Sequence, residues 1–191
     1  MNCLIDEVIG VEHEYLRHMS RMDENGLRDL MNSYGQSVWD YAFVLTKSPH
    51  LADDISQDVF LKAFQRISTF RGESSVKTWL LAITRHTVFN YRKSAFFRKV
   101  LLVGFRPDRQ ASQSAEKEYL SHAYAHDLWA LVLALPTKYR EVLVLEVKYG
   151  LSMQEMASLL GISEGTAKSR LHRARKKVSD ALKEGEGYET I

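Results

Sequence analysis

Apolar residues recur at intervals of three and four along most of the chain, and no stretch alternates clearly between apolar and polar residues. Side chains with this spacing share one face of an α-helix. The pattern predicts helices over residues 26–47, 52–68, 76–95, 121–135, 137–148, 153–160 and 165–182. Between Arg98 and Lys117 the periodicity is lost and Gly, Pro, Ser and Gln accumulate, which is typical of a linker.

We therefore expect an all-α protein built from two small helical domains. The first covers residues 26–97 and the second residues 121–183, and a flexible linker at 98–120 joins them. The remaining residues form an N-terminal extension at 1–25 and a tail at 184–191.

Composition excludes several classes of protein. Of the 191 residues 45% are hydrophobic and 26% charged, which is ordinary for a globular protein. The single cysteine, Cys3, cannot form an internal disulfide, which favours a reducing compartment. The longest apolar run has eight residues, at 128–135, too few to span a bilayer, and the start of the chain does not resemble a signal peptide. The expectation is a cytoplasmic protein with no membrane insertion.

Charge is distributed unevenly although the formal net charge is only +2. Residues 6–58 contain eleven acidic and four basic residues, whereas residues 71–99 contain seven basic residues and one acidic residue. In residues 168–177 six of the ten residues are basic and none is acidic. These blocks are either solvated helix faces, or one surface for a protein partner and two for a polyanion.

Residues 152–182 have the pattern of two helices joined by a tight turn. Ser152 and Glu155 match a capping box, Gly161 can adopt the left-handed conformation that ends a helix, and Ser163 can cap the next helix. The apolar residues of this second helix fall on one stripe that we expect to be buried: Ala167, Leu171, Ala174, Val178 and Leu182. This pattern, with a basic second helix, predicts a helix-turn-helix.

The second helix of such a motif lies in the major groove of DNA. Residues near its start are candidates for contacting base edges: Thr166, Lys168, Ser169 and Arg170. Residues farther along are candidates for binding phosphates: Arg173, Arg175, Lys176 and Lys177. A helical hairpin with a basic surface is the alternative, but the capping box and the acid-free basic run at 168–177 favour DNA binding.

The segment at 52–64 predicts a helix with two different faces. One is an apolar stripe: Ile55, Val59, Ala63 and Ile67. The other is acidic and ends in an apolar residue: Asp54, Gln57, Asp58 and Leu61. The second stripe is either a solvated face or a docking surface for a basic helix of a partner protein.

A polar loop at 69–75 precedes a helix in which aromatic and basic residues are interleaved. They include Trp79, Arg85, His86, Phe89, Tyr91, Arg92 and Lys93. Such a surface suits single-stranded nucleic acid, because the rings stack on bases while the cations follow the phosphates. Each ring is individually as well suited to the core, so only the combination indicates this function.

Four segments together resemble the extracytoplasmic-function (ECF) sigma factors of bacteria. They are ADDISQDVFLKAF at 52–64, FRGESSVKTWL at 70–80, LPTKYREV at 135–142 and GTAKSRLHRAR at 165–175. In this family, two helical domains, called region two and region four, are joined by a flexible linker. The resemblance covers about residues 27–97 and 123–182.

The resemblance implies a subunit that directs core RNA polymerase to promoters. It assigns binding of the clamp helices of the largest polymerase subunit to Asp54, Gln57, Asp58 and Leu61. It assigns recognition and melting of the −10 element to Phe70, Arg71, Gly72, Glu73, Ser74, Ser75, Lys77, Trp79, Arg85, Asn90, Arg92 and Lys93. The helix-turn-helix would read the −35 element, and the apolar helix at 128–135 would help hold the flap of the second-largest subunit.

The family also suggests an anti-sigma protein, often membrane-anchored, as a further partner. His86 and Asn90 stand where the family more often has Asn and Asp, which affects the expected promoter sequence rather than the role. One alternative is a helix-turn-helix regulator that does not act as a sigma subunit. An enzyme is disfavoured, because His122 and His126 have a spacing that could bind metal but no catalytic motif, cofactor motif or further ligand accompanies them.

Overall fold

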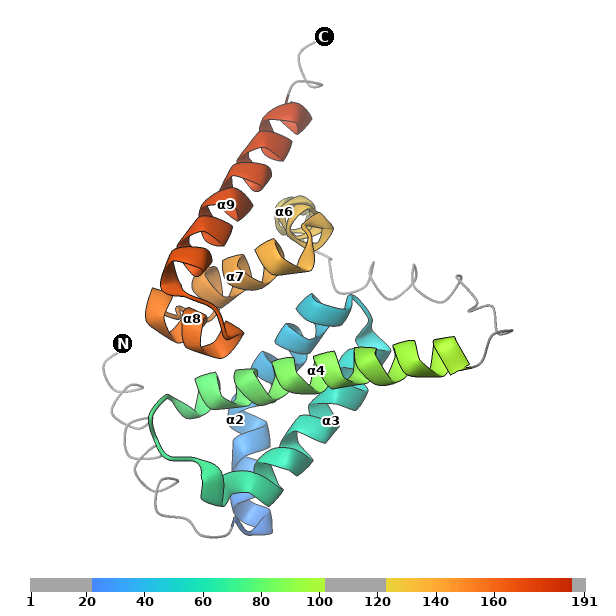
Figure 1. Ribbon diagram of the computed structural model, residues 1–191, viewed down its shortest axis with the longest axis vertical. Coiled ribbons are helices and arrows are strands. Elements are labelled where there is room, and N and C mark those ends of the chain that lie inside the picture. The colour runs from blue at the N-terminus through green and yellow to red at the C-terminus, as the bar shows by residue number, and fades with distance from the viewer. Residues whose placement is uncertain (1–21, 102–122, 187–191) are drawn as a thin grey trace. The chain divides into compact units, whose positions relative to one another are not determined.

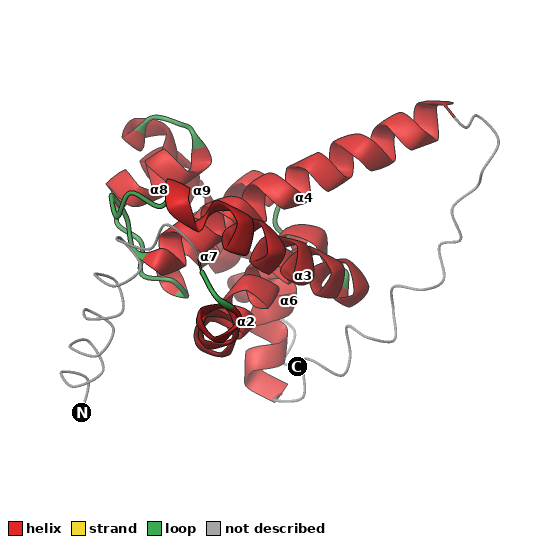
Figure 2. Ribbon diagram, turned by 90° about the horizontal axis from the view of Figure 1, so that it is seen from below, coloured by secondary structure: helices red, strands yellow, loops and turns green. Residues whose placement is uncertain are grey.

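The computed structural model describes residues 22–101 and 123–186, and every regular element within them is a helix (Figures 1 and 2). In chain order the elements are α2 (Glu24–Thr46), α3 (Pro49–Arg66), the 3₁₀ helix η1 (Ile67–Thr69), α4 (Val76–Leu101), α6 (Ala123–Ala134), α7 (Thr137–Val147), α8 (Met153–Leu160) and α9 (Glu164–Glu186). They form two compact units: the first contains α2 as far as Phe43, α3 from His50 and α4, and the second contains α6 to α9. The all-α prediction is confirmed.

Two helices run farther than the sequence pattern predicted. The linker was expected from Arg98 and the tail from Glu184, but α4 continues to Leu101 and α9 to Glu186. No proline or glycine interrupts residues 98–101, and the one glycine near the end of α9 does not stop it. Fading amphipathicity alone does not end a helix, because the backbone hydrogen bonds continue until a competing conformation replaces them. The rest of the predicted linker, the first 21 residues and residues 187–191 lie outside the described residues.

The first unit is organised around the apolar stripe of α3. Ile55, Val59, Ala63 and Ile67 are each at most 2% exposed, as the sequence predicted. Polar contacts at the edges connect α3 to its neighbours. The indole N–H of Trp39 on α2 donates to Asp53 Oδ1 at 2.6 Å, and Lys62 Nζ donates to Thr87 Oγ1 on α4 at 3.2 Å. One side of α3 is thereby committed to the core and the other faces outward.

In the second unit, a buried arginine ties α6 to α7. Arg140 is 2% exposed, and its guanidinium donates to the carbonyl oxygens of Leu133 at 2.6 Å and Leu135 at 3.2 Å. Carbonyls at the end of α6 have no partner within the helix, so these bonds satisfy them and set the α6–α7 corner. A buried charge is stable only with such partners.

In the helix-turn-helix, α8 begins and ends as the sequence predicted, and α9 begins at the predicted serine cap. Ser152 Oγ accepts from the backbone N–H of Glu155 at 3.2 Å, and Glu155 Oε2 accepts from the N–H of Ser152 at 2.9 Å, which completes the capping box of α8. Gly161 ends α8 with φ 65°. Ser163 Oγ then accepts from the N–H of Thr166 at 3.2 Å and starts α9, which packs against α7 and α8.

Candidate polymerase-binding and DNA-binding surfaces

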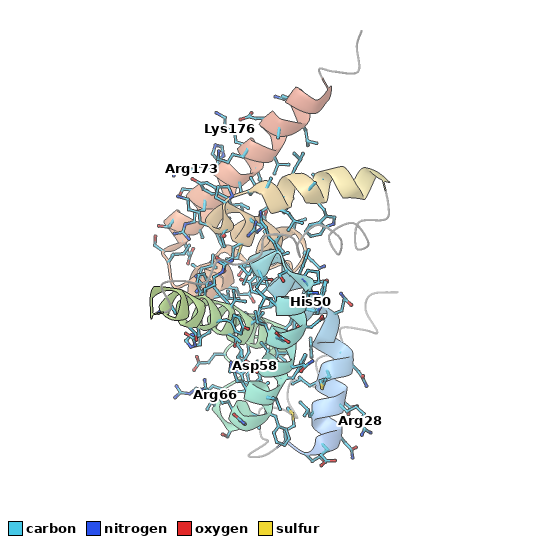
Figure 3. All side chains as sticks on the ribbon, turned by 90° about the vertical axis from the view of Figure 1, so that its right-hand side faces the viewer. Arg28, His50, Asp58, Arg66, Arg173 and Lys176 are labelled. Carbon is cyan, nitrogen blue, oxygen red and sulfur yellow. The ribbon has the colours of Figure 1, made fainter. Side chains whose placement is uncertain are left out.

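The outer face of α3 carries an apolar residue among acidic ones. Asp54, Gln57, Asp58 and Leu61 are all exposed, and Leu61 is 55% exposed (Asp58 is labelled in Figure 3). Lys62 Nζ lies 3.7 Å from Asp58 Oδ2, one helical turn away, with both side chains partly exposed. A pair in this setting contributes little energy, so it leaves Asp58 available to a partner. The stripe predicted from the sequence is therefore presented on the surface.

The loop before α4 is held at both ends and open between them. Phe70 is 6% exposed, and its ring centroid lies 5.3 Å from that of Trp79. At the other end Ser75 Oγ accepts from the backbone N–H of Thr78 at 3.0 Å and caps α4. Arg71 and Glu73, between these anchors, are exposed. Of the residues predicted to contact DNA, Phe70 is therefore buried and anchors the loop. The exposed charged residues, Arg71 and Glu73, lie in the middle of the loop.

On α4 an aromatic ring lies between two arginines. The guanidinium carbons of Arg85 and Arg92 lie 4.8 and 6.0 Å from the ring centroid of Phe89. These residues follow one helix face at i, i+4 and i+7, and α4 contains no acidic residue. The remaining predicted DNA contacts of this unit divide into two groups. Asn90, Arg92 and Lys93 are exposed, and Gly72, Ser74, Ser75, Lys77, Trp79 and Arg85 are partly buried.

The exposed surface of α9 is basic and polar. Lys168, Ser169, His172, Arg173, Arg175, Lys176 and Lys177 are exposed, and Thr166 and Arg170 are partly buried (Figure 3 labels Arg173 and Lys176). The hydroxyl of Thr166 lies 2.9 Å from Ser163 Oγ, and Ser169 Oγ donates to the carbonyl oxygen of Thr166 at 3.0 Å. Thr166 is therefore engaged in capping the helix, while Lys168 and Arg170 extend from the turn that follows.

Tyr139, at the start of α7, contacts Arg173 of α9. A hydrogen bond from Arg173 is the main cause that lowers the pKa of the Tyr139 hydroxyl below its ordinary value of 10.0, and the nearby Lys138 charge acts in the same direction. Lys138 Nζ also lies 5.0 Å from the ring centroid of Tyr139. No sequence pattern pointed to this contact, since the two residues belong to different helices and are 34 positions apart.

An apolar groove of about 650 Å³ lies between α6, α7 and α9. Its lining includes three exposed apolar residues: Leu128 at 47%, Val147 at 74% and Leu182 at 41% exposure. The prediction that Leu182 belongs to a continuous buried stripe is wrong. Ala167, Leu171 and Ala174 are at most 4% exposed, but α7 and α8 do not cover α9 as far as Leu182. Val147 is a surface residue that no sequence pattern indicated.

Nothing in the described residues suggests a metal centre. No three side chains among the described His, Cys, Asp and Glu residues are arranged to hold an ion. The pair of His122 and His126 considered from the sequence lies outside the described side chains. Within the described ranges, no helix is both long and apolar enough to cross a bilayer.

Sequence comparison identifies both units. Residues 30–95 match the family model for Sigma-70 region 2, and residues 125–178 match that for Sigma-70, region 4. The chain is 31% identical over 169 residues to RNA polymerase sigma factor YlaC of Bacillus subtilis (strain 168), a match that covers 87% of this chain and 98% of that protein. ECF RNA polymerase sigma factor SigX of the same strain is 30% identical over 152 residues, covering 77% and 78%. The chain belongs to the ECF sigma factors.

The fold of this sigma factor is also similar to two solved structures. One is the sigma factor RpoE in complex with the anti-sigma factor NepR from Bartonella quintana, with a TM-score of 0.65 and 23% identity over 82% of this chain and 96% of that chain. The other is CnrH in complex with the cytosolic domain of CnrY, with a TM-score of 0.61 and 23% identity over 93% and 97%. These similarities show that the helical fold is shared.

As an ECF sigma factor, the chain directs RNA polymerase to promoters and supports transcription initiation. Its family consists of initiation factors rather than enzymes. A helix-turn-helix regulator of another class would account for the match at 125–178 but not for the region 2 match at 30–95. The sigma function predicted from the sequence is confirmed.

Proposed function

We propose that the first unit, predicted as region two at residues 26–97, holds the sigma factor on core polymerase through the outer face of α3. The observation that carries this assignment is Leu61, a large apolar residue that is 55% exposed within an acidic stripe. An apolar contact surrounded by carboxylates suits a helix with an apolar ridge and basic flanks. We assign that helix to the clamp of the largest polymerase subunit, with Asp54, Gln57 and Asp58 as the polar contacts.

The loop before α4 and the adjoining face of α4 would recognise the −10 element as a single strand. Extruding a base from the duplex costs on the order of a few kcal/mol, which contacts to the extruded base must offset. The anchored loop offers Arg71, Gly72, Glu73 and Ser74 for that contact, while Phe70 and Ser75 fix its ends. Along α4 the residues that follow the strand are Lys77, Trp79, Arg85, Asn90, Arg92 and Lys93. Phe89, between two arginines, adds a stacking surface beside them.

The second unit, predicted as region four at residues 121–183, would read the −35 element with α9. We assign contacts to base edges in the major groove to Lys168, Ser169 and Arg170, with Thr166 beside them at the start of the helix. Arg173, Lys176 and Lys177 would bind phosphates and so position the helix without reading sequence. The α6–α7–α9 groove would receive the flap of the second-largest polymerase subunit, since it exposes apolar residues beside the cations of Lys148 and Lys183.

Regulation is proposed by analogy with the structural neighbours, two of which were solved with the anti-sigma factor NepR or with the cytosolic domain of CnrY. We propose that an anti-sigma protein, of the kind that is often anchored in the membrane, holds this chain inactive by covering its polymerase-binding surfaces. We also propose that the protein acts in the cytoplasm, where the polymerase resides, and performs no catalytic chemistry of its own.

Gel filtration with bacterial core RNA polymerase in the absence of DNA tests the proposal. The wild-type chain should co-elute with core at one-to-one stoichiometry, and Asp58→Arg should abolish co-elution because it places a cation opposite a basic helix. Asp29→Arg is the matched control, since it makes the same charge change at an exposed acid of α2 outside the stripe. Loss of binding in both variants, or in neither, would show that α3 is not the docking surface.

A further inference from the structure

The basic helix α9 contains one arginine whose charge is already used within the protein. Arg175 Nη2 lies 2.7 Å from Glu146 Oε2 and 2.8 Å from Glu146 Oε1, so the guanidinium contacts both oxygens of the carboxylate. The side chain of Arg175 is 61% exposed and that of Glu146 25% exposed. The pair therefore joins α9 to the end of α7 at the surface of the second unit. From its position in the sequence alone, Arg175 is a candidate phosphate ligand.

The position of Arg175 on α9 differs from that of its basic neighbours. It follows buried Ala174 and stands one turn after buried Leu171, on the edge of α9 that borders α7. It also lines the apolar groove, with Val147 and Val178. Lys176, by contrast, comes nine residues after buried Ala167 and therefore lies on the opposite side of the helix. A phosphate bound by Arg175 would have to replace a carboxylate that already neutralises it.

Surface ion pairs add little stability, but a single guanidinium nitrogen within 2.8 Å of both carboxylate oxygens limits the distance between this point of α9 and the end of α7. At a rise of 1.5 Å per residue, residues 166–170 lie about 7–14 Å along α9 from Arg175. A rotation of α9 by about 10° about this point displaces them by roughly 1–2 Å. Since a hydrogen bond tolerates only a few tenths of an ångström, that displacement is enough to lose a base contact.

We infer that Arg175 is a positioning residue: with Glu146 it holds α9 on α7 at the angle that presents residues 166–170 to the −35 element. The inference rests on the proposed function of α9. Base contacts specify a sequence, whereas phosphate contacts bind all sequences alike. The Arg175–Glu146 pair therefore contributes to discrimination between promoters and not to the number of phosphates bound.

The experiment uses the full chain reconstituted with bacterial core polymerase. Its probes are the duplex most enriched by the holoenzyme from a pool randomised at −35, and the same duplex with that element scrambled. Affinity for both is measured over a range of salt concentrations for the wild type, Arg175→Gln, Glu146→Gln, the double variant and the control Lys176→Gln. Glutamine keeps most of the side-chain length at each position, and circular dichroism checks that helical content is retained.

We expect Arg175→Gln and Glu146→Gln to reduce the ratio of the two affinities by the same factor, about five- to tenfold, the low end of the cost of one lost base contact. The double variant should be no worse than either single variant, and the salt slope should not change. Lys176→Gln should instead lower the slope by about 0.9 while leaving the ratio unchanged, as expected for one lost phosphate contact.

Two results would overturn the inference. In the first, Arg175→Gln lowers the salt slope as Lys176→Gln does and Glu146→Gln strengthens binding to both duplexes, which is the behaviour of a phosphate ligand released from its carboxylate. In the second, neither variant changes the ratio. A wild-type holoenzyme that enriches no −35 sequence from the pool would overturn the proposed function of α9 together with the inference, and this is seen before any variant is tested.

Discussion

Val147 offers a quantitative test of the groove as the site for the polymerase flap. The residue is 74% exposed on α7 and lines the groove. Full burial of a valine or leucine side chain is worth about 1.5–3 kcal/mol, so covering the exposed part of Val147 contributes about 1–2 kcal/mol. Val147→Lys forfeits this contribution. Since 1.4 kcal/mol corresponds to tenfold, the affinity for the flap should fall about 5- to 27-fold.

Isothermal titration of the full chain with the flap domain of the second-largest subunit measures this affinity. Because Val147 is exposed in the free protein, lysine at this position should leave the fold intact, as circular dichroism would show. Met31→Lys is the matched control, since Met31 is 45% exposed on α2 of the other unit. Its affinity should remain within about twofold of wild type, in line with a surface change outside the contact. The assignment of the groove is refuted by a Val147→Lys chain that binds as the wild type does.

Three further predictions concern the second unit. Arg170→Ala should weaken holoenzyme binding to the preferred −35 sequence by about 1–3 kcal/mol and relax specificity there, measured against scrambled duplexes. Arg173→Gln should raise the pKa of Tyr139 toward 10.0, because it removes the hydrogen bond that lowers it, as an NMR titration of the tyrosine ring would show. The pKa of Tyr139 is lower in the folded state than in the unfolded state. Ionisation of Tyr139 therefore adds stability as the pH rises from the folded-state pKa to the unfolded-state pKa, and this contribution is lost as the pH falls through the folded-state pKa. Ser152→Ala should cost about 1 kcal/mol in the unfolding of the second unit, since it removes the cap of α8.

Each of these predictions has an outcome that contradicts it. Equal weakening on all duplexes would make Arg170 a phosphate contact. If the pKa of Tyr139 is unchanged in Arg173→Gln, the hydrogen bond from Arg173 is not the cause of the lowered pKa. The Tyr139→Phe variant assigns the NMR signal, because the signal of this tyrosine is missing from its spectrum. For the cap, Ser158→Ala on the exposed side of the same helix is the control. An equal loss of stability in both serine variants would show that Ser152 has no special role.

The parts of the fold that the sequence predicted best depend on neighbouring residues alone. The predicted bounds of α8 agree with the structure, because its start and end are set by the Ser152–Glu155 capping box and by Gly161. The buried stripe of α3 was equally predictable, since Ile55, Val59 and Ala63 repeat every four residues. The exposure of Asp58 and Leu61 then followed from their place on the opposite side of the same helix.

Only the tertiary structure decided how far each helix is covered and which distant residues meet. Leu182 has the same helical phase as Leu171, but it is 41% exposed because the helices that cover Leu171 do not reach it. Arg175 and Glu146 are 29 residues apart, and their pairing depends on the packing of α9 against α7. A helical repeat determines the side of a helix on which a residue lies. Whether that side meets solvent, an apolar groove or a carboxylate is set by the neighbouring helices. For this reason Leu182 is exposed although Leu171 is buried, and Arg175 is paired with a carboxylate of α7.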